Sequence, residues 1–518
     1  MPSIAQNARS HPDRPAVIFG NGDSVETYAE LEERSRRIAL ALRALGLRVG
    51  DCIALVLGND ETYMDFYWAT QRIGLYLTPI NWHLTAAEAA LIVANCDAKV
   101  VLVGAELGAV GPALLSAGIG RSARPMAIGG EIAGFEAFDP FIRSIAENMP
   151  LTDETAGSVM LYSSGTTGQP KGIRRALSRC SPDDPAYTAA QTRMVRIYGF
   201  HAEDRYLCTA PLYHAAPVRS CSAVHVLGGT VIVLKRFDAA LALRVIEAQR
   251  VTVSQWVPTH FKRLLDLPAD QRRRADISSL RVALHAAAPC PVPLKRAMID
   301  WWGPILLEYY AGTEGGGTII DSEEWLRHPG SVGKPWSGVE VGVFDDQRRR
   351  ILEPRVAGTI YFKDESAATR FVYYKNEELT SKTHQGDWFT LGDMGYLDED
   401  GYLFLTDRQS NMIISGGVNI YPQEIENCLA VHRKVFDVAV IGVPDDEMGE
   451  QVRAVVIPAA GIEPDAALAE ELIAYARREL AHFKCPKAVD FVTELPRTET
   501  GKLQKRLLMS RCGAGRPA

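Results

Sequence analysis

The stretch MLYSSGTTGQPKG occupies residues 160–172, and the fold prediction for the whole chain starts from it. Its first residues, together with Val159 before them, are apolar and suit a buried strand. Two serines, two threonines, three glycines and Lys171 follow within ten residues. Small hydroxyl residues and glycines let backbone N–H groups surround an anion, and a lysine adds a positive charge. The stretch therefore predicts a strand that ends in a phosphate-binding loop.

This loop differs from the P-loop of nucleoside triphosphatases, in which Gly-Lys is followed by Ser or Thr. Here Lys171 follows a proline and precedes Gly172. Taken alone, such a run is equally compatible with a flexible Gly/Ser/Thr surface turn. The other motifs of the chain decide between these two interpretations.

Composition limits the classes of protein that the chain can belong to. At 518 residues it is too long for one hydrophobic core, so we expect two or more domains. Its 47% hydrophobic and 23% charged residues are typical of a globular protein, and a net charge of −7 gives no reason to expect nucleic acid as a partner. We find no apolar run long enough for a membrane span and no apolar core of a secretory signal. Because the nine cysteines are scattered singly, we expect reduced thiols and a cytoplasmic location.

The order of helical and strand patterns predicts an α/β fold. Capping boxes at Thr27/Glu30 and Thr85/Glu88 each precede a helical pattern, and Asn59 is placed to cap a further helix. Between the helices lie short runs typical of buried strands, at residues 52–57, 100–103, 206–209, 231–234 and 280–284. This alternation favours mainly parallel sheets.

Five more segments carry polar or glycine-rich motifs. They are PLYH at 211–214, YAGTE at 310–314, WFTLGD at 388–393, DRQSNMIISGGVNIYPQEIE at 407–426 and PRTETGK at 496–502. Together with SSGTTGQPKG, and in the same order, they resemble the motifs of the adenylate-forming (AMP-binding) superfamily, which comprises acyl-CoA synthetases, adenylation domains and luciferases. The chain departs from the family pattern at Ala311, where glycine is usual, at Leu391, where threonine is usual, and at Ser410 and Asn411 in the hinge.

The resemblance implies two domains joined near Ser410. Residues 1–409 are expected to form a large N-terminal α/β domain with mainly parallel sheets, which binds ATP and the acid. Residues 410–518 are expected to form a smaller, mobile C-terminal α+β lobe that carries Lys502. Rotation of this lobe between two half-reactions is part of the same expectation.

The resemblance also implies the residues of the active site. The residues expected to bind ATP belong to the phosphate loop, the adenine site and the ribose site. They are Ser163, Ser164, Gly165, Thr166, Thr167, Gly168, Ala286, Ala287, Ala288, Tyr310, Thr313, Asp393 and Arg408. Catalytic roles are expected for Lys171, His214, Glu314 and Lys502. Glu314 is the expected ligand of Mg²⁺, and Gly417 is expected to leave room for the arm of coenzyme A.

The function that the resemblance implies is that of an AMP-forming acyl-CoA synthetase. ATP and a carboxylic acid give an acyl-adenylate and diphosphate, and the thiol of coenzyme A then displaces AMP. Three alternatives stay open: transfer of the adenylate to a carrier protein, a nucleotide-binding regulator without catalysis, and a luciferase-like oxygenase. Amino acids are disfavoured as substrates, because Ala215 and Ala216 stand where amino-acid adenylation domains place an aspartate.

Small side chains predict the kind of acid. Residues 213–226 are mostly small and apolar, with Arg219 as the only fixed charge, and small residues recur at 286–288 and 315–317. Apolar volume favours a bulky tail, because each buried CH₂ group of a ligand gains about 0.8 kcal/mol. We therefore expect a medium- or long-chain fatty acid, or an aromatic or alicyclic acid of similar bulk. The alternative is that these small residues pack against other elements and the pocket is short. The sequence leaves the oligomeric state open, a homodimer being one option.

Overall fold

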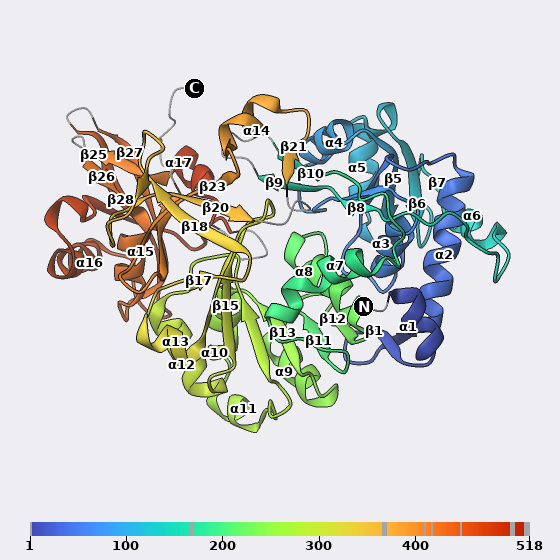
Figure 1. The fold of residues 1–518 in the computed structure, drawn as a ribbon. Helices are drawn as coiled ribbons and strands as arrows, with labels where there is room; N and C mark the ends of the chain where they lie inside the picture. Colours follow the sequence, from blue (N-terminus) through green and yellow to red (C-terminus); the bar gives the residue numbers. More distant parts are fainter. Residues whose placement is uncertain are drawn as a thin grey trace.

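The computed structural model describes residues 3–164, 170–364, 370–408, 411–415, 418–445, 448–497 and 503–511. Figure 1 shows parallel sheets and their helices in the blue-to-yellow part of the chain, with the orange and red C-terminal elements beside them.

The largest sheet contains nine strands. Its central strands, from β15 to β1, run parallel, and β2, β16 and β17 add antiparallel edges. The strand order is β17 (Lys334–Pro335), β16 (Thr318–Asp321), β15 (Leu306–Tyr310), β14 (Val282–His285), β13 (Val253–Trp256), β11 (Arg205–Cys208), β12 (Thr230–Val233), β1 (Pro15–Phe19) and β2 (Ser24–Thr27).

A second sheet is parallel throughout. Its strand order is β7 (Glu136–Ala137), β6 (Arg124–Ile128), β5 (Ala98–Gly104), β3 (Cys52–Val56), β4 (Tyr76–Pro79) and β8 (Ser158–Val159). The predicted parallel α/β architecture is therefore confirmed.

Alternating side chains explain why both faces of these sheets are covered. Along β1, Val17 packs in a core that the two sheets share, while Ile18 packs on the opposite face. Helices α2 (Tyr28–Ala44), α3 (Tyr63–Gln71) and α8 (Ala215–Leu227) contribute to the shared core. Helices α9 (Ala239–Ala248), α10 (Pro258–Leu265) and α12 (Val292–Trp302) cover the other face of the nine-stranded sheet, and α4 (Ala86–Asn95) and α5 (Val110–Ser116) cover that of the second sheet.

The remaining sheets are antiparallel, apart from one parallel pair of strands in the C-terminal sheet. Strands β9 (Leu161–Ser164), β10 (Pro170–Arg175) and β21 (Phe371–Tyr373) form one, and β18 (Val339–Phe344), β19 (Arg350–Ile351), β20 (Gly358–Asp364), β22 (His384–Gln385), β23 (Trp388–Leu397) and β24 (Leu403–Arg408) form another. The C-terminal sheet contains β25 (Ile413–Ser415), β26 (Val418–Ile420), β27 (Val435–Asp445), β28 (Gly449–Pro458) and β29 (Ala488–Phe491), with helices α15 (Pro422–Ala430), α16 (Ala466–Glu479) and α17 (Lys505–Arg511). The remaining helices are α1 (Ile4–Ser10), α6 (Asp139–Ser144), α7 (Pro185–Ile197), α11 (Ala269–Arg274), α13 (Ser322–Arg327) and α14 (Glu377–Thr383).

Most predicted elements are confirmed, and one local prediction is wrong. The capping boxes of Thr27 and Thr85 start α2 and α4 as expected. Asn59, however, does not cap the next helix, because α3 begins at Tyr63 after Thr62. The Asn59 amide instead donates to two backbone carbonyls, those of Ala210 (3.2 Å) and Leu234 (2.8 Å). Its side chain is used to join two distant loops, which a local capping rule does not anticipate.

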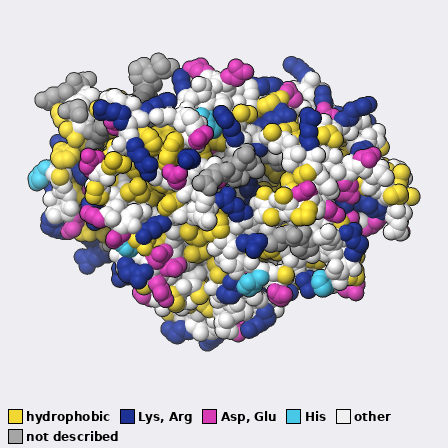
Figure 2. Space-filling model, viewed as in Figure 1, with side chains coloured by type: hydrophobic (Ala, Val, Ile, Leu, Met, Phe, Trp, Pro, Cys, Tyr) yellow, Lys and Arg dark blue, Asp and Glu magenta, His cyan; other side chains and the backbone are white. Residues whose placement is uncertain are grey.

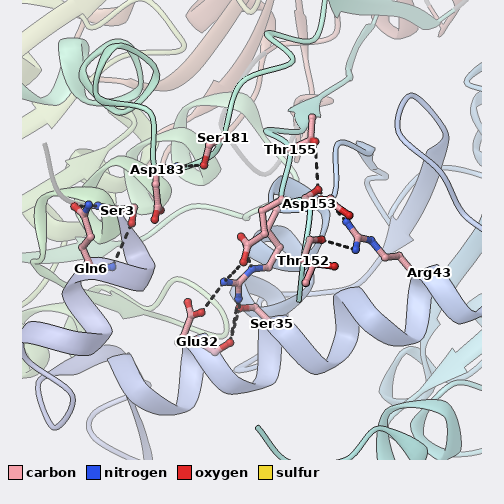
Figure 3. Close-up of polar contacts among 12 residues, drawn as sticks. Ser3, Gln6, Glu32, Ser35, Arg43, Thr152, Asp153, Thr155, Ser181 and Asp183 are labelled. Carbon is pink, nitrogen blue, oxygen red and sulfur yellow. Dashed lines mark hydrogen bonds and ion pairs between the residues drawn. The ribbon is translucent and has the colours of Figure 1, made fainter. Parts of the chain in front are cut away.

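The segment that precedes β8 is bound to helix α2 and the residue after α3. Arg43 donates to the carbonyl oxygens of Thr152 (2.7 Å) and Asp153 (3.1 Å), and Figure 3 shows its side chain directed at both. Arg72 forms ion pairs with Glu32 of α2 (2.6 Å) and with Glu154 (3.2 Å). These contacts fix the start of the chain segment that leads into β9 and the predicted phosphate loop.

The surface carries charges of both signs. Figure 2 shows Lys and Arg side chains interspersed with Asp and Glu side chains over the face in view. Within the described ranges, no helix combines the length and the apolar character that crossing a bilayer requires.

Candidate active site

The predicted phosphate loop connects the two strands of a hairpin. In the antiparallel pair β9–β10, Ser163 lies opposite Lys171 and Tyr162 lies opposite Gly172. The loop residues Gly165, Thr166, Thr167 and Gly168 lie outside the described residues, as does the side chain of Ser164. The hairpin nevertheless shows that Ser163 and Lys171 face each other at the base of this loop.

Tyr373 connects Lys171 with Glu314. Strand β21 pairs with β10, and the ammonium nitrogen of Lys171 lies 5.7 Å from the centroid of the Tyr373 ring. The Tyr373 hydroxyl donates a hydrogen bond of 2.9 Å to Oε1 of Glu314. Two motifs that are far apart in the sequence therefore meet through a tyrosine that belongs to neither. Sequence reasoning missed Tyr373, because only the pairing of β10 with β21 brings it to the site.

A pocket opens beside this tyrosine. It has a volume of about 310 Å³ and is lined by Lys171, Gly172, Tyr373, Lys375 and Lys382, among other residues. Lys375 is paired with Asp97 at 2.7 Å, and Lys382 with Glu378 at 2.5 Å. The pocket lining therefore carries charges of both signs, and Lys171 contributes one of its lysines at the place where the predicted phosphate loop begins.

The turn that carries Thr313 and Glu314 is tightly packed. Gly312 and Gly315 exchange backbone hydrogen bonds of 3.1 and 3.3 Å. Gly316 and Gly317 have φ values of 71° and 154°, and a Cβ atom on Gly317 would lie 1.6 Å from the Trp336 ring. Glycine is required at these positions because an aromatic ring covers the backbone. Gly316 and Gly317 are therefore packing positions, and they do not add the pocket volume that the sequence suggested.

Two arginines bind the backbone of the same turn. Nη2 of Arg175, at the end of β10, donates to the carbonyl oxygens of Thr313 (3.3 Å) and Glu314. Nη2 of Arg219, on α8, donates to the same Thr313 oxygen at 3.3 Å. Burial lowers the pKa of Arg219, and burial together with the charge of Arg219 lowers the pKa of Arg175.

The predicted adenine and ribose residues come from two different sheets, which a side-chain hydrogen bond joins. The Tyr310 hydroxyl at the end of β15 donates to Oδ2 of Asp393 on β23, at 2.6 Å. Ala286 to Ala288 follow β14, the neighbour of β15 in the sheet, and Ala286 is buried. Ala287 has φ of 75°, which is unfavourable for a residue with a Cβ atom and is typical of backbone held at a functional site. Arg408 lies opposite Asp393 in the register of β23 and β24, and its side chain is outside the described residues.

His214 lies at the start of helix α8. It occupies the position before the first helical residue, with extended backbone (φ −89°, ψ 154°), and its ring lies 4.6 Å from that of Tyr213. The preceding segment is held by Asn59, whose side-chain oxygen accepts from the Leu212 N–H at 2.8 Å. Sequence reasoning missed this role of Asn59, which no local pattern signals.

The contacts described above do not include three of the predicted site features, namely Lys502, Gly417 and a metal ligand set at Glu314. Lys502 and Gly417 lie outside the described residues. In the described part of the chain, a group of three side chains suited to a metal ion occurs at His328, Asp398 and Asp400, and Glu314 is not part of it. A Mg²⁺ ion at Glu314 would therefore take most of its ligands from phosphate oxygens and water, as this ion commonly does.

Comparison with known protein families identifies both parts of the chain. Residues 4–371 match the AMP-binding enzyme family, and residues 424–502 match the C-terminal domain of AMP-binding enzymes. The long-chain-fatty-acid–CoA ligase FadD13 of Mycobacterium tuberculosis is 30% identical over 99% of this chain and 98% of its own length.

Two further proteins support this assignment. A methyl-dioxo-octahydroindenyl-propanoyl:CoA ligase of Mycobacterium tuberculosis is 34% identical over 96% of both chains. The structure of o-succinylbenzoate CoA synthetase of Bacillus subtilis, in complex with its acyl-adenylate intermediate, matches with a TM-score of 0.82 and 27% identity over 98% of both chains. The chain therefore belongs to the AMP-binding enzyme family and is an acid–thiol ligase.

Proposed function

We propose that this protein is an AMP-forming acyl-CoA synthetase that acts on a medium- or long-chain fatty acid or on a bulky aromatic or alicyclic acid. The carboxylate attacks the α-phosphate of ATP, and diphosphate leaves to give the acyl-adenylate. The thiolate of coenzyme A then attacks the acyl carbon and AMP leaves. The main support is the contact series Lys171–Tyr373–Glu314, which joins the base of the phosphate hairpin to the carboxylate of a separate motif.

Positive charge has to be supplied where the phosphates carry negative charge in the first step. In this proposal, Lys171 and the loop of Ser163 to Gly168 hold the diphosphate part of ATP. The pocket beside Lys171 supports this role, because Lys171, Lys375 and Lys382 all line it. Glu314 would hold Mg²⁺, and Tyr373 orients its carboxylate by the hydrogen bond to Oε1.

The adenosine part of ATP is assigned to the carboxyl ends of β14 and β15 and to the adjacent residues of β23 and β24. Tyr310 and the run Ala286 to Ala288 line the adenine site, where small side chains let a ring lie close to the backbone. Asp393 binds the ribose hydroxyls with Arg408, and the Tyr310–Asp393 hydrogen bond supports a common site for base and sugar. Thr313 binds the phosphates beside Glu314, and His214 acts at the reacting carboxylate.

Two domains divide this work in the proposal, residues 1–409 and residues 410–518. Support comes from the separate C-terminal sheet of β25 to β29 and from the two separate family matches. Lys502 on the smaller domain bridges the carboxylate and the α-phosphate in the first step. In the second step the domain rotates, Lys502 leaves, and Gly417 gives the coenzyme A arm access to the adenylate.

The two half-reactions test this proposal separately. Lys502→Ala should lower adenylate formation by about 10²–10³, the loss expected when a preorganised charge-stabilising donor is removed. Transfer of a supplied acyl-adenylate to coenzyme A should be affected much less. Equal losses in both half-reactions would contradict the two-position role of Lys502. A panel of acids assayed for AMP release with and without coenzyme A decides whether this thiol is the acceptor.

A further inference from the structure

The two arginines at the Thr313 carbonyl are held without an ionic partner from the protein. Arg175 donates to the carbonyl oxygens of Thr313 and Glu314, and Arg219 donates to that of Thr313. In the described ranges neither guanidinium forms an ion pair with a carboxylate. A guanidinium has several N–H donors, and each arginine uses one nitrogen, Nη2, for these contacts. Donor capacity is therefore left over on both side chains.

This arrangement is costly in the absence of a ligand. Burial disfavours both charges, and the neighbouring cation disfavours that of Arg175 further, while Glu314 and Asp364 offset part of the cost. Arginine does not escape such a position by losing its proton, because its pKa lies too far above neutral pH. An acceptor oxygen on a bound molecule would compensate for the cost.

Arg219 lies on the acid side of the site. It follows His214 by five positions on α8, and its contact with Thr313 places its head group at the turn that carries Glu314. Of the small residues expected to line this region, Val218, Cys221 and Ala223 are buried in the shared core. Ala215, Ala216 and Arg219 keep partial exposure. The part of α8 that is open to a ligand is therefore less apolar than its sequence suggested.

Aromatic side chains narrow the same region. Tyr309 precedes Tyr310 on β15, and alternation along a strand places its side chain on the opposite face from the Tyr310–Asp393 contact. The ring of Tyr309 stacks on Tyr198 at 5.1 Å, and its hydroxyl accepts from Gln255 at 2.7 Å. The guanidinium of Arg219 lies at the Thr313 carbonyl and interacts electrostatically with both Tyr309 and Glu314.

We propose that Arg219 binds a second oxygen function, a ketone or a carboxylate, on the acyl part of the acid substrate. The preferred acid is then a compact cyclic acid that carries such an oxygen rather than an unsubstituted fatty chain. This inference rests on the proposed function and narrows its substrate class. It is consistent with the names of two related enzymes, whose acids are a dioxo-octahydroindenyl propanoate and a succinylbenzoate.

Matched pairs of acids test this inference. One pair is cyclohexylpropanoate and its ring ketone, and the other is phenylpropanoate and its para-carboxylate. The readout is kcat/KM for acid-dependent exchange of diphosphate into ATP. Because a hydrogen bond to a charged group contributes about 1.5–3 kcal/mol, wild-type enzyme should prefer the oxygenated member of at least one pair by about 10–100-fold. The pair that shows the preference identifies the oxygen function.

Variants at Arg219 separate binding from a structural role. In Arg219→Leu the preference should fall to a ratio of about one, since hydrogen bonding to the added oxygen is lost. Arg219→Gln keeps an N–H donor and should retain part of the preference for a ketone but not for a carboxylate. Arg174→Gln on the same strand as Arg175 is the matched control, because Arg174 lies over the rings of Tyr76 and Tyr374 instead. This control should keep the wild-type ratio.

Each contrary result has a distinct meaning. If Arg219→Leu lowers exchange with both members of a pair equally, Arg219 only supports the Thr313 turn and the inference is wrong. A wild-type preference for the unsubstituted acids would also overturn it while leaving the proposed function intact. No exchange with any carboxylic acid would overturn both. If Arg219→Leu does not fold, greater thermal stabilisation of the wild-type enzyme by ATP plus an oxygenated acid, relative to its partner acid, provides the same comparison.

Discussion

Arg72 and Arg219 lie in the same large α/β part of the molecule, and their surroundings differ completely. Arg72 is 4% exposed and contacts two carboxylates, those of Glu32 and Glu154. Burial alone would lower the pKa of Arg72, but the two carboxylates raise it above its usual value. Arg219 contacts a carbonyl oxygen, and burial lowers its pKa. A buried arginine that carboxylates of the chain neutralise stabilises the fold. We infer that one bound only to carbonyl oxygens is available to a ligand.

A like-charged pair away from the site sharpens this comparison. Glu26 and Asp65 are buried neighbours, and burial raises the pKa of Glu26 to about 7 and that of Asp65 well above its usual value. Carboxyl groups in this position can take up a proton and become neutral. The guanidinium groups of Arg175 and Arg219 have no such option, because arginine keeps its proton at neutral pH.

Replacement of Arg72 should give the largest effect on stability. Arg72→Ala leaves the carboxylates of Glu32 and Glu154 partly buried without their cation, so the free energy of unfolding should fall by about 3–5 kcal/mol. Denaturant unfolding measures this loss. Arg43→Ala is the matched control, because Arg43 donates to two exposed carbonyl oxygens in the same segment, as Figure 3 shows. The control should lose about 1 kcal/mol or less, and similar losses in both variants would contradict the distinction.

The Glu26–Asp65 pair should make stability depend on pH. The folded-state pKa of Glu26, about 7, is higher than its ordinary value of 4.5. The folded protein therefore holds a proton that the unfolded chain releases, so stability is full below about pH 4.5 and is lost as the pH rises toward 7. From the size of the shift, the loss is about 3 kcal/mol at most.

Glu26→Gln tests this pH dependence. The amide does not titrate, so the variant should lose less stability than wild type between pH 4.5 and 7.5. Unfolding followed at several pH values gives both slopes. Parallel slopes would show that Glu26 is ionised in the folded protein throughout this range, which would contradict the effect of its burial beside Asp65.

The sequence predicted the local motifs better than the contacts between them, for a physical reason. Motifs such as residues 163–172 and 388–393 are short and contiguous, so their pattern is local. Tyr373 and Arg175 reach Glu314 only through strand pairing and turn packing, across 59 and 139 positions. The small residues of α8 were expected to line the pocket, but Val218, Cys221 and Ala223 are buried in the shared core. A pocket volume cannot be predicted from small residues alone, because neighbouring elements can fill the space that they leave.

Tyr373→Phe should give an intermediate effect on catalysis. The change removes the hydroxyl that donates to Glu314 and keeps the ring near Lys171. Loss of a hydrogen bond to a charged group costs about 1.5 kcal/mol or more, which is roughly tenfold in kcat/KM for MgATP. Titration of the exchange reaction with Mg²⁺ should show that the variant needs a higher Mg²⁺ concentration than wild type to reach half of its maximal rate. Unchanged kinetics would mean that the orientation of Glu314 does not depend on Tyr373.

The smallest expected effect has the opposite sign from that of Arg72. Arg175→Gln removes one of two neighbouring cations and keeps an amide donor for the carbonyl oxygens of the turn. Because active-site charges are commonly destabilising in the absence of ligand, the free energy of unfolding should rise by about 0.5–1 kcal/mol. Arg72→Gln should instead lower it, since Glu32 and Glu154 lose their ion pairs. Unfolding of both variants at low ionic strength, without ATP or acid, shows whether each substitution raises or lowers the free energy of unfolding. A loss of stability in Arg175→Gln would show that the guanidinium supports the turn by more than its charge costs, and the contrast between the two arginines would then fail.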